Sequence, residues 1–280
     1  MQIAHTKTEV REAVAAARAE EQVIGLVPTM GALHDGHRAL VDASVANCDF
    51  TVVSIFVNPT QFGPGEDLDK YPSDLDADTR LCEQAGADLI FAPEPSEMYD
   101  ASGNTTVHVA GVTEGLCGAF RPGHFDGVTT VVCKLLRIAT PDRAYFGEKD
   151  YQQLVVIRTM VADLDIAVEI VGIPTVREAD GLALSSRNRH LSREERAAAP
   201  ALRQALVGGA EAAERGASGS EVERIVANRL AQEPLFRAQY ISAVHPDTLV
   251  PREGDGTPMT ILAAAFLGNT RLIDNIRIEG

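Results

Sequence analysis

The chain has 280 residues, of which 45% are hydrophobic. It is long enough for one large domain or two, and too apolar to be intrinsically disordered. Its net charge of −15 and its lack of a lysine- and arginine-rich tract argue against nucleic acid as a partner. It shows no amino-terminal signal pattern and no apolar run of membrane-spanning length, and its four cysteines form no zinc or disulfide pattern. These features predict a soluble, cytoplasmic protein with no membrane partner.

Strands alternate with helices over roughly the first 175 residues. Thr6 and Glu9 have the spacing of a capping box, which predicts a helix that runs to about residue 21. The apolar runs predict strands at 23–27, 50–57, 88–92, 144–146 and 168–171. Between them, helices are predicted from about residue 37 and at 73–85, 128–138 and 152–162. This alternation is typical of an α/β fold whose parallel sheet has helices on both faces.

The pattern changes after residue 174. Two helices are predicted at 193–207 and 220–231, followed by strands at 240–244, 260–266 and 271–278. This order is that of a smaller α+β domain. The sequence therefore predicts domains at 1–175 and 176–280.

The segment PTMGALHDGH, at 28–37, follows a predicted buried strand and leads into a helix. Backbone N–H groups and the positive end of the helix dipole gather at such a place, which suits a phosphate. Gly31 and Gly36 allow close approach of a ligand to the main chain. His34 and His37 add two donors. The alternative is that these histidines only cap the helix or lie on the surface, but the H-x-G-H spacing after a buried strand favours a nucleotide site.

Three further segments lie at predicted strand ends or at the domain boundary. Asn58 and Gln61 follow the strand at 50–57 and offer neutral groups that can orient a hydroxyl or carboxylate, although an ordinary Asn-Pro turn is an equal alternative. Lys149 and Gln153 follow the strand at 144–146 and could bind phosphate oxygens and a substrate. The loop at 185–187 carries two hydroxyls and a guanidinium that could clamp a triphosphate.

The sequence is compatible with two roles for Arg121 and His124, in RPGHF. Both side chains could face the cleft, or both could belong to a surface turn.

Together, PTMGALHDGH, NPTQF, RPGHFDGVTT, FGEKDYQQL and LSSRN resemble the motif series of the pantothenate synthetase (pantoate–β-alanine ligase) family. They occur in the family's order and span residues 28 to 188. HDGH alone would indicate only the wider nucleotidylyltransferase superfamily.

The resemblance implies a Rossmann-like amino-terminal domain that binds nucleotide and pantoate, a smaller carboxy-terminal lid domain and a homodimer. It also implies a ligase of pantothenate biosynthesis that uses ATP and Mg²⁺. Pantoate would attack the α-phosphorus of ATP and release pyrophosphate, and β-alanine would then displace AMP from pantoyl adenylate.

The resemblance also assigns residues. His37 would be the proton donor, Gln61 would bind pantoate and β-alanine, and Gln153 would bind pantoate. The ATP site would comprise Met30, Gly31, Ala32, Leu33, His34, Asp35, Gly36, His37, Gly147, Glu148, Lys149, Asp150, Val176, Leu184, Ser185, Ser186 and Arg187. Leu184 and Asp35 replace a methionine and a glutamate common in the family, and both changes are mild.

The chemistry also suits the residues themselves. No catalytic nucleophile is needed, because the substrate carboxylate attacks, and the protein's task is to align the reactants and to neutralise the pyrophosphate. His34, His37, Lys149 and Arg187 are the groups expected to do so, around one triphosphate pocket.

Two other hypotheses are adenylyl transfer to another small phosphate or carboxylate, and a nucleotide sensor without catalysis. The Mg²⁺ ligands are unknown: Asp74, Asp76 and Asp78 are candidates, or they are only a charged helix start.

Overall fold

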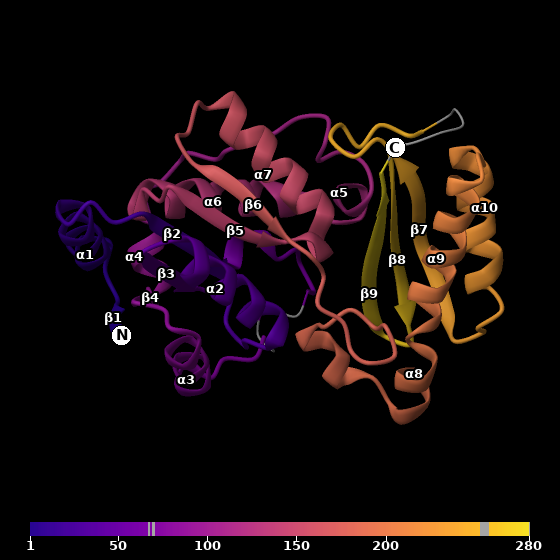
Figure 1. The fold of residues 1–280 in the computed structure, drawn as a ribbon, viewed down its shortest axis with the longest axis horizontal. Coiled ribbons are helices and arrows are strands. Elements are labelled where there is room, and N and C mark those ends of the chain that lie inside the picture. The colour runs from indigo at the N-terminus through magenta and orange to yellow at the C-terminus, as the bar shows by residue number, and fades with distance from the viewer. Residues whose placement is uncertain (67, 69–70, 253–257, 280) are drawn as a thin grey trace. The chain divides into compact units, whose positions relative to one another are not determined.

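The computed structural model describes residues 1–66, 68, 71–252 and 258–279 (Figure 1). The chain divides into two compact units. Unit 1 comprises Met1–Glu114, Gly118–Glu148 and Val156–Pro174. Unit 2 comprises Gly115–Cys117, Lys149–Val155 and Thr175–Gly280. Each unit has its own sheet.

Unit 1 is built on a parallel sheet with the order β1-β4-β3-β2-β5-β6. Its strands are β1 (Gln2–Ala4), β2 (Ile24–Thr29), β3 (Phe50–Ile55), β4 (Leu89–Phe91), β5 (Arg143–Gly147) and β6 (Glu169–Ile173). The β-branched runs of β2 and β3 are buried on both faces, as expected for central strands of a parallel sheet. From β2 the chain passes to β3 on one side and later returns to β5 on the other. The order of the strands therefore reverses at β2.

Helices cover both faces of this sheet. The longer ones are α1 (Lys7–Ala19), α2 (Asp35–Asn47), α3 (Leu75–Ala85), α6 (His124–Ala139) and α7 (Tyr151–Asp163), and the short ones are α4 (Pro95–Met98) and α5 (Cys117–Phe120). The predicted capping box of Thr6 and Glu9 is confirmed at the start of α1. Helix α1 packs beside α6, whereas α2 packs beside α3 on the opposite face, over a core that includes Val27, Val53 and Ile90. The predicted α/β class, with a parallel sheet and helices on both faces, is confirmed.

Unit 2 contains a three-stranded antiparallel sheet of β7 (Phe236–Val244), β8 (Met259–Leu267) and β9 (Thr270–Ile278). Helices α9 (Ala201–Glu214) and α10 (Gly219–Leu230) pack against it, and small alanines of β8 let them approach closely. The helix predicted at 193–207 is interrupted, because Pro200 separates α8 (Arg193–Ala198) from α9. All four cysteines are free, and Cys82 is buried whereas Cys48, Cys117 and Cys133 are partly buried.

Within the described ranges, every helix is too short or too polar to cross a lipid bilayer.

Candidate active site

The turn after β2 begins where ligands bind in open parallel sheets. Strands β2 and β5 are neighbours and run parallel, so their carboxyl ends, at Thr29 and Gly147, lie at the same edge. This is the point at which the strand order reverses, and a crevice forms beyond the carboxyl ends of strands at such a point. The predicted nucleotide motif, 28–37, therefore starts at the expected edge of the sheet.

A buried carboxylate holds this turn. Asp78, on α3, is 3% exposed and accepts the backbone N–H groups of Ala32 (2.9 Å) and Leu33 (2.7 Å). Gly31 and Ala32 both have positive φ, 84° and 52°, and a Cβ on Gly31 would lie 2.9 Å from Asp78 Oδ2. Burial raises the pKa of Asp78, and the hydrogen bonds from Leu33 and Ala32 oppose that rise. A carboxylate distant in sequence thus fixes an otherwise strained turn.

The aspartates considered for Mg²⁺ have other roles at the start of α3. Asp78 uses both oxygens on the turn, and Asp74 caps the helix by accepting the N–H of Ala77 at 2.9 Å. Asp76 is exposed in the first turn. Of the two alternatives, Mg²⁺ ligands or a charged helix start, the second describes Asp74 and Asp76. In the part of the chain that the structure describes, no three His, Cys, Asp or Glu side chains group as metal ligands.

His34 and His37 are both tied to the backbone through Nδ1. His34 is the N-cap of α2, and its Nδ1 accepts the N–H of Gly36 at 3.1 Å. The Nδ1 of His37 accepts the N–H of His34 at 3.3 Å, and the two ring centroids are 4.1 Å apart. An imidazole whose Nδ1 accepts carries its proton on Nε2. Both half-buried histidines therefore cap the N-terminus of α2 through Nδ1 and can donate from Nε2. A role as helix caps and a role in a nucleotide site are thus compatible.

The residues that follow β3 form a second polar cluster in unit 1. Asn58 caps the short helix η1 (Pro59–Gln61), and Asn58 and Gln61 are 1% and 9% exposed. The amide Nε2 of Gln61 lies 3.0 Å from the sulfur of Met30, which joins this cluster to the turn after β2. Both ends of the Asn58 side-chain amide are hydrogen-bonded within the protein, Nδ2 to Gly127 and Gln61 and Oδ1 to Tyr99 and Thr60. The sequence suggested it as a substrate ligand, but its polar atoms are already used.

Arg121 and His124 hold the backbone of Gln61. His124 donates from Nδ1 to the Gln61 carbonyl at 2.8 Å, and Arg121 donates from Nη1 to His124 Nε2 at 3.0 Å. Arg121 also forms a two-pronged ion pair with Glu66, with distances of 2.8 and 2.6 Å. Burial raises the pKa of Glu66, but the hydrogen bonds and charge of Arg121 outweigh it and leave the pKa below its usual value. These half-buried residues brace the site and are not a free surface turn.

The segment after Gly147 forms η3 (Glu148–Asp150) and runs into α7, and its residues Lys149–Val155 belong to unit 2. The carbonyl of half-buried Lys149 accepts a hydrogen bond from Asn275 at 3.0 Å. The two glutamines that follow differ. Gln152 is buried and bridges the Cys117 N–H and the Gly115 carbonyl, at 2.9 and 3.0 Å, whereas Gln153 is half-buried. The structure therefore separates a structural glutamine from the one predicted to bind substrate.

The predicted ATP residues beyond 175 lie together in unit 2. The N–H of Leu184 donates to the carbonyl of Val176 at 3.0 Å, and Ser185 caps η4 (Ser186–His190). Arg177 anchors this loop through a two-pronged ion pair with buried Asp274, with both distances 2.8 Å. The sequence did not single out Arg177 or Asp274, because each is far from its partner along the chain.

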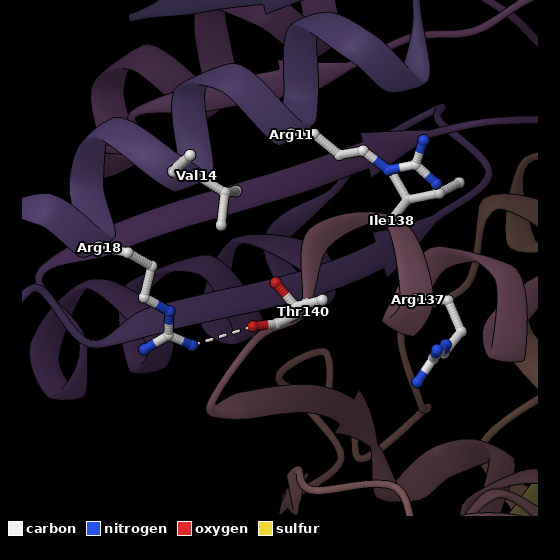
Figure 2. A pocket seen from close by; sticks show the side chains of 7 residues that line it. Arg11, Val14, Arg18, Arg137, Ile138 and Thr140 are labelled. Atoms are coloured by element: carbon white, nitrogen blue, oxygen red, sulfur yellow. Dashed lines mark hydrogen bonds between the residues drawn. The ribbon is translucent and has the colours of Figure 1, made fainter.

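A separate pocket of about 420 Å³ lies in unit 1 between α1 and the end of α6 (Figure 2). It is lined by Arg11, Val14, Ala15, Arg18, Arg137, Ile138 and Thr140. Arg18 is hydrogen-bonded to the Thr140 carbonyl and to Asp142, whose other oxygen accepts the N–H of Ile24 at the start of β2. This pocket therefore borders the amino ends of the strands and contains none of the predicted site residues.

Comparison with known proteins gives one consistent result. A family model described as pantoate-beta-alanine ligase matches residues 2–277. The pantothenate synthetase of Pseudomonas entomophila is 53% identical to this chain, with coverage of 100% of this chain and 98% of that protein. The pantothenate synthetase of Moorella thermoacetica is 51% identical, with 100% and 99% covered.

The solved structures agree. That of pantothenate synthetase from Thermus thermophilus has a TM-score of 0.94 at 48% identity and covers both chains completely. That of the ligase from Francisella tularensis, complexed with beta-gamma ATP and beta-alanine, has a TM-score of 0.80 at 33% identity and covers 99% of this chain and 97% of that one. This chain belongs to the pantoate–β-alanine ligase family.

Proposed function

We propose that this chain is a ligase that condenses pantoate with β-alanine to form pantothenate, with conversion of ATP to AMP and pyrophosphate. A carboxylate oxygen of pantoate attacks the α-phosphorus, and the bond to pyrophosphate breaks. The amine of β-alanine then attacks the acyl carbon of pantoyl adenylate, AMP leaves, and the amine loses a proton. Family membership over the whole chain supports this reaction, as does the Francisella relative, solved with ATP-like and β-alanine ligands.

The strongest structural support is the pair of histidines at the start of α2. Their Nδ1 atoms are tied to backbone N–H groups, so each presents Nε2–H at a helix N-terminus beside the central strand. Such donors stabilise charge that grows on the pyrophosphate oxygens as the α-phosphorus bond breaks. We assign His37 as the proton donor and His34 as a second donor. The backbone from Met30 to Gly36, with exposed Asp35, supplies the rest of the phosphate cradle.

Unit 2 supplies the cations of the proposal. Lys149 and Arg187 would neutralise phosphate oxygens, Lys149 as a point charge and Arg187 through a planar fork. The other proposed ATP contacts are Gly147, Glu148, Asp150, Val176, Leu184, Ser185 and Ser186. The hydrogen bond between Leu184 and Val176 supports treating those two as one surface.

Pantoate would be bound by Gln61 and Gln153, and β-alanine by Gln61. Both glutamines are neutral, and they can orient a carboxylate without attracting the proton that would quench its nucleophilicity. Asn58 contacts Gln61, because its Nδ2 donates to the Oε1 of Gln61 at 3.1 Å.

We propose that Mg²⁺ enters with ATP. Mg²⁺ keeps several waters and binds through substrate phosphates with one or two carboxylates, so it needs no protein cage. This fits the described residues, where no cluster of three ligands occurs. When bound, the ion would add positive charge along the phosphates.

The reaction is tested by supplying ATP, Mg²⁺, pantoate and β-alanine and omitting each in turn. We expect pyrophosphate to form without β-alanine, in an amount limited to the enzyme, and AMP to appear only when both substrates are present. A product that keeps AMP would instead support adenylyl transfer to another acceptor. ATP binding with no pyrophosphate from any carboxylic acid would support a sensor.

A Rossmann-like character of unit 1, a homodimer and a cytoplasmic location complete the proposal. The parallel sheet whose order reverses at β2 supports the first. The other two rest on the family resemblance, and light scattering of the purified protein tests the dimer.

A further inference from the structure

The side-chain amide of Asn58 is surrounded by five hydrogen-bonding groups. Its Nδ2 donates to the carbonyl of Gly127 and to Oε1 of Gln61, both at 3.1 Å. Its Oδ1 accepts from the hydroxyls of Tyr99 (2.7 Å) and Thr60 (2.9 Å), and more distantly from the Thr60 N–H (3.4 Å). Both hydrogens and both lone pairs are therefore used inside the protein.

Two of these groups fix which way round the Asn58 amide lies. The Gly127 carbonyl can only accept, and the Thr60 N–H can only donate, whereas hydroxyls can do either. A reversed amide would turn its oxygen toward the Gly127 carbonyl and its NH₂ toward the Thr60 N–H. Both contacts would be repulsive at a buried position, where an unpaired polar group is strongly unfavourable.

The absence of a side chain at residue 127 makes this arrangement possible. A Cβ there would collide with the backbone of Thr60 and Gln61. Glycine lets α6 approach η1 closely enough for its carbonyl to reach Asn58.

The fixed polarity passes to Gln61. Because Asn58 presents N–H, Gln61 must present Oε1 to it, and the Gln61 NH₂ then points to the other side. In the described part of the chain, the only protein acceptor within hydrogen-bond distance of that NH₂ is the sulfur of Met30, which is weak. Gln61 thus has strong donor capacity left on the side away from Asn58.

We propose that the Gly127 carbonyl and Asn58 form a relay that locks Gln61 as a hydrogen-bond donor toward substrate. Asn58 is in this view a positioning residue that does not touch substrate. The relay selects an acceptor, such as a carboxylate oxygen of pantoate, over a group that must itself donate. This inference rests on the proposed binding of pantoate by Gln61.

The test compares Gln61→Glu, Gln61→Ala, Asn58→Ala and the Gln61→Ala/Asn58→Ala double variant in the full-length enzyme. Gln61→Glu keeps an acceptor for Asn58 but offers a second acceptor to substrate, so it isolates polarity from packing. Tyr99→Phe is the matched control, because it removes one hydrogen bond from Asn58 and leaves the two groups that fix its polarity. The readouts are the KM values for pantoate and ATP and the single-turnover rate of pyrophosphate release, with thermal unfolding to confirm folding.

We expect Gln61→Glu and Asn58→Ala each to raise the pantoate KM about tenfold or more, with the ATP KM changed less than about twofold. Tyr99→Phe should raise the pantoate KM less than about threefold. In the Gln61→Ala background, Asn58→Ala should add nothing, because it acts through Gln61. Additive losses, or a Gln61→Glu enzyme that binds pantoate normally, would overturn the relay while leaving the proposed function intact. A Gln61→Ala enzyme with normal pantoate KM and normal adenylation would instead remove Gln61 from the site.

Discussion

At the scale of single residues, the proposed catalysis depends on which ring nitrogen of each histidine carries the proton. The imidazoles of His34 and His37 carry theirs on Nε2 because backbone N–H groups occupy both Nδ1 atoms. His124 has the opposite tautomer, because its Nδ1 faces the Gln61 carbonyl and its Nε2 faces the Arg121 guanidinium. These three histidines of unit 1 thus have two different tautomers, which follow from their neighbours and not from residue type.

Lys149→Ala and His37→Ala should each lower the rate of pyrophosphate release about 10²–10³-fold. Each removes a donor or charge that acts mainly in the transition state. The measurement is single-turnover adenylation with saturating ATP and pantoate.

Arg224→Ala is the matched control for Lys149→Ala, because Arg224 is an exposed cation on α10. It should leave the rate within about twofold. Pyrophosphate release at the wild-type rate by either site variant would exclude that residue from the mechanism.

The sequence was informative at positions whose spacing carries the signal. The H-x-G-H turn and the preference for Gln153 over Gln152 as ligand come from motifs. Tyr99 and Gly127 could not be found in this way, because they meet Asn58 only through the packing of α4's end and of α6 against η1. Such contacts depend on tertiary structure, and no local pattern records them.

At the scale of elements, the turn after β2 depends on a carboxylate from α3. Asp78→Asn should lower the free energy of unfolding by about 1–3 kcal/mol, because an amide cannot accept both N–H groups and turns one donor toward another. The ATP KM should rise as well, since the turn begins the proposed phosphate cradle. Urea unfolding and steady-state kinetics measure the two effects.

Asp76→Asn, two residues earlier in the same helix, is the control. It loses only an exposed charge near the helix N-terminus, worth about 0.3–1 kcal/mol. Equal effects of the two substitutions would show that Asp78 does not hold the turn.

The brace formed by Arg121 and Glu66 should make stability depend on pH. The folded protein favours the Glu66 carboxylate, so its pKa is lowered on folding. The stability from this group is therefore complete above the pKa of the unfolded chain and is lost as the pH falls through the lower folded pKa. Wild type should exceed Glu66→Gln in free energy of unfolding at pH 7, and the difference should shrink below about pH 4.5.

Exposed Glu12 provides the comparison, and Glu12→Gln should show a much smaller pH-dependent difference. A Glu66→Gln difference that stays constant down to pH 3 would contradict the role assigned to the ion pair.

The elements themselves were largely predictable from the sequence, because long apolar runs and a capping box mark them strongly. One element was missed and one prediction failed, each for a physical reason. Strand β1 has only three residues, Gln2–Ala4, and is defined by its pairing with β4, so it has no periodicity to detect. The helix predicted at 193–207 kept its apolar pattern through Pro200, where the missing N–H ends one helix and begins the next.

At the scale of the whole molecule, the alternation of strands and helices predicted the parallel sheet. The change of pattern after residue 174 predicted a smaller α+β part, and this part contains the antiparallel sheet. The negative net charge makes the proposed cations conspicuous, since an anionic nucleotide needs local positive charge on an acidic protein. The strand order could not be predicted from the sequence, because it depends on the side of β2 to which each crossover connection brings the next strand.

The proposed reaction begins when the pantoate carboxylate attacks the α-phosphorus of ATP. The most direct measurement starts from pantoate labelled with 18O in its carboxylate and follows the label during one complete turnover with ATP and β-alanine. Because the attacking oxygen stays on phosphorus when the amine displaces AMP, we predict AMP that carries one labelled oxygen, and pyrophosphate that carries none. Unlabelled AMP, or label in inorganic phosphate accompanied by ADP, would contradict the account.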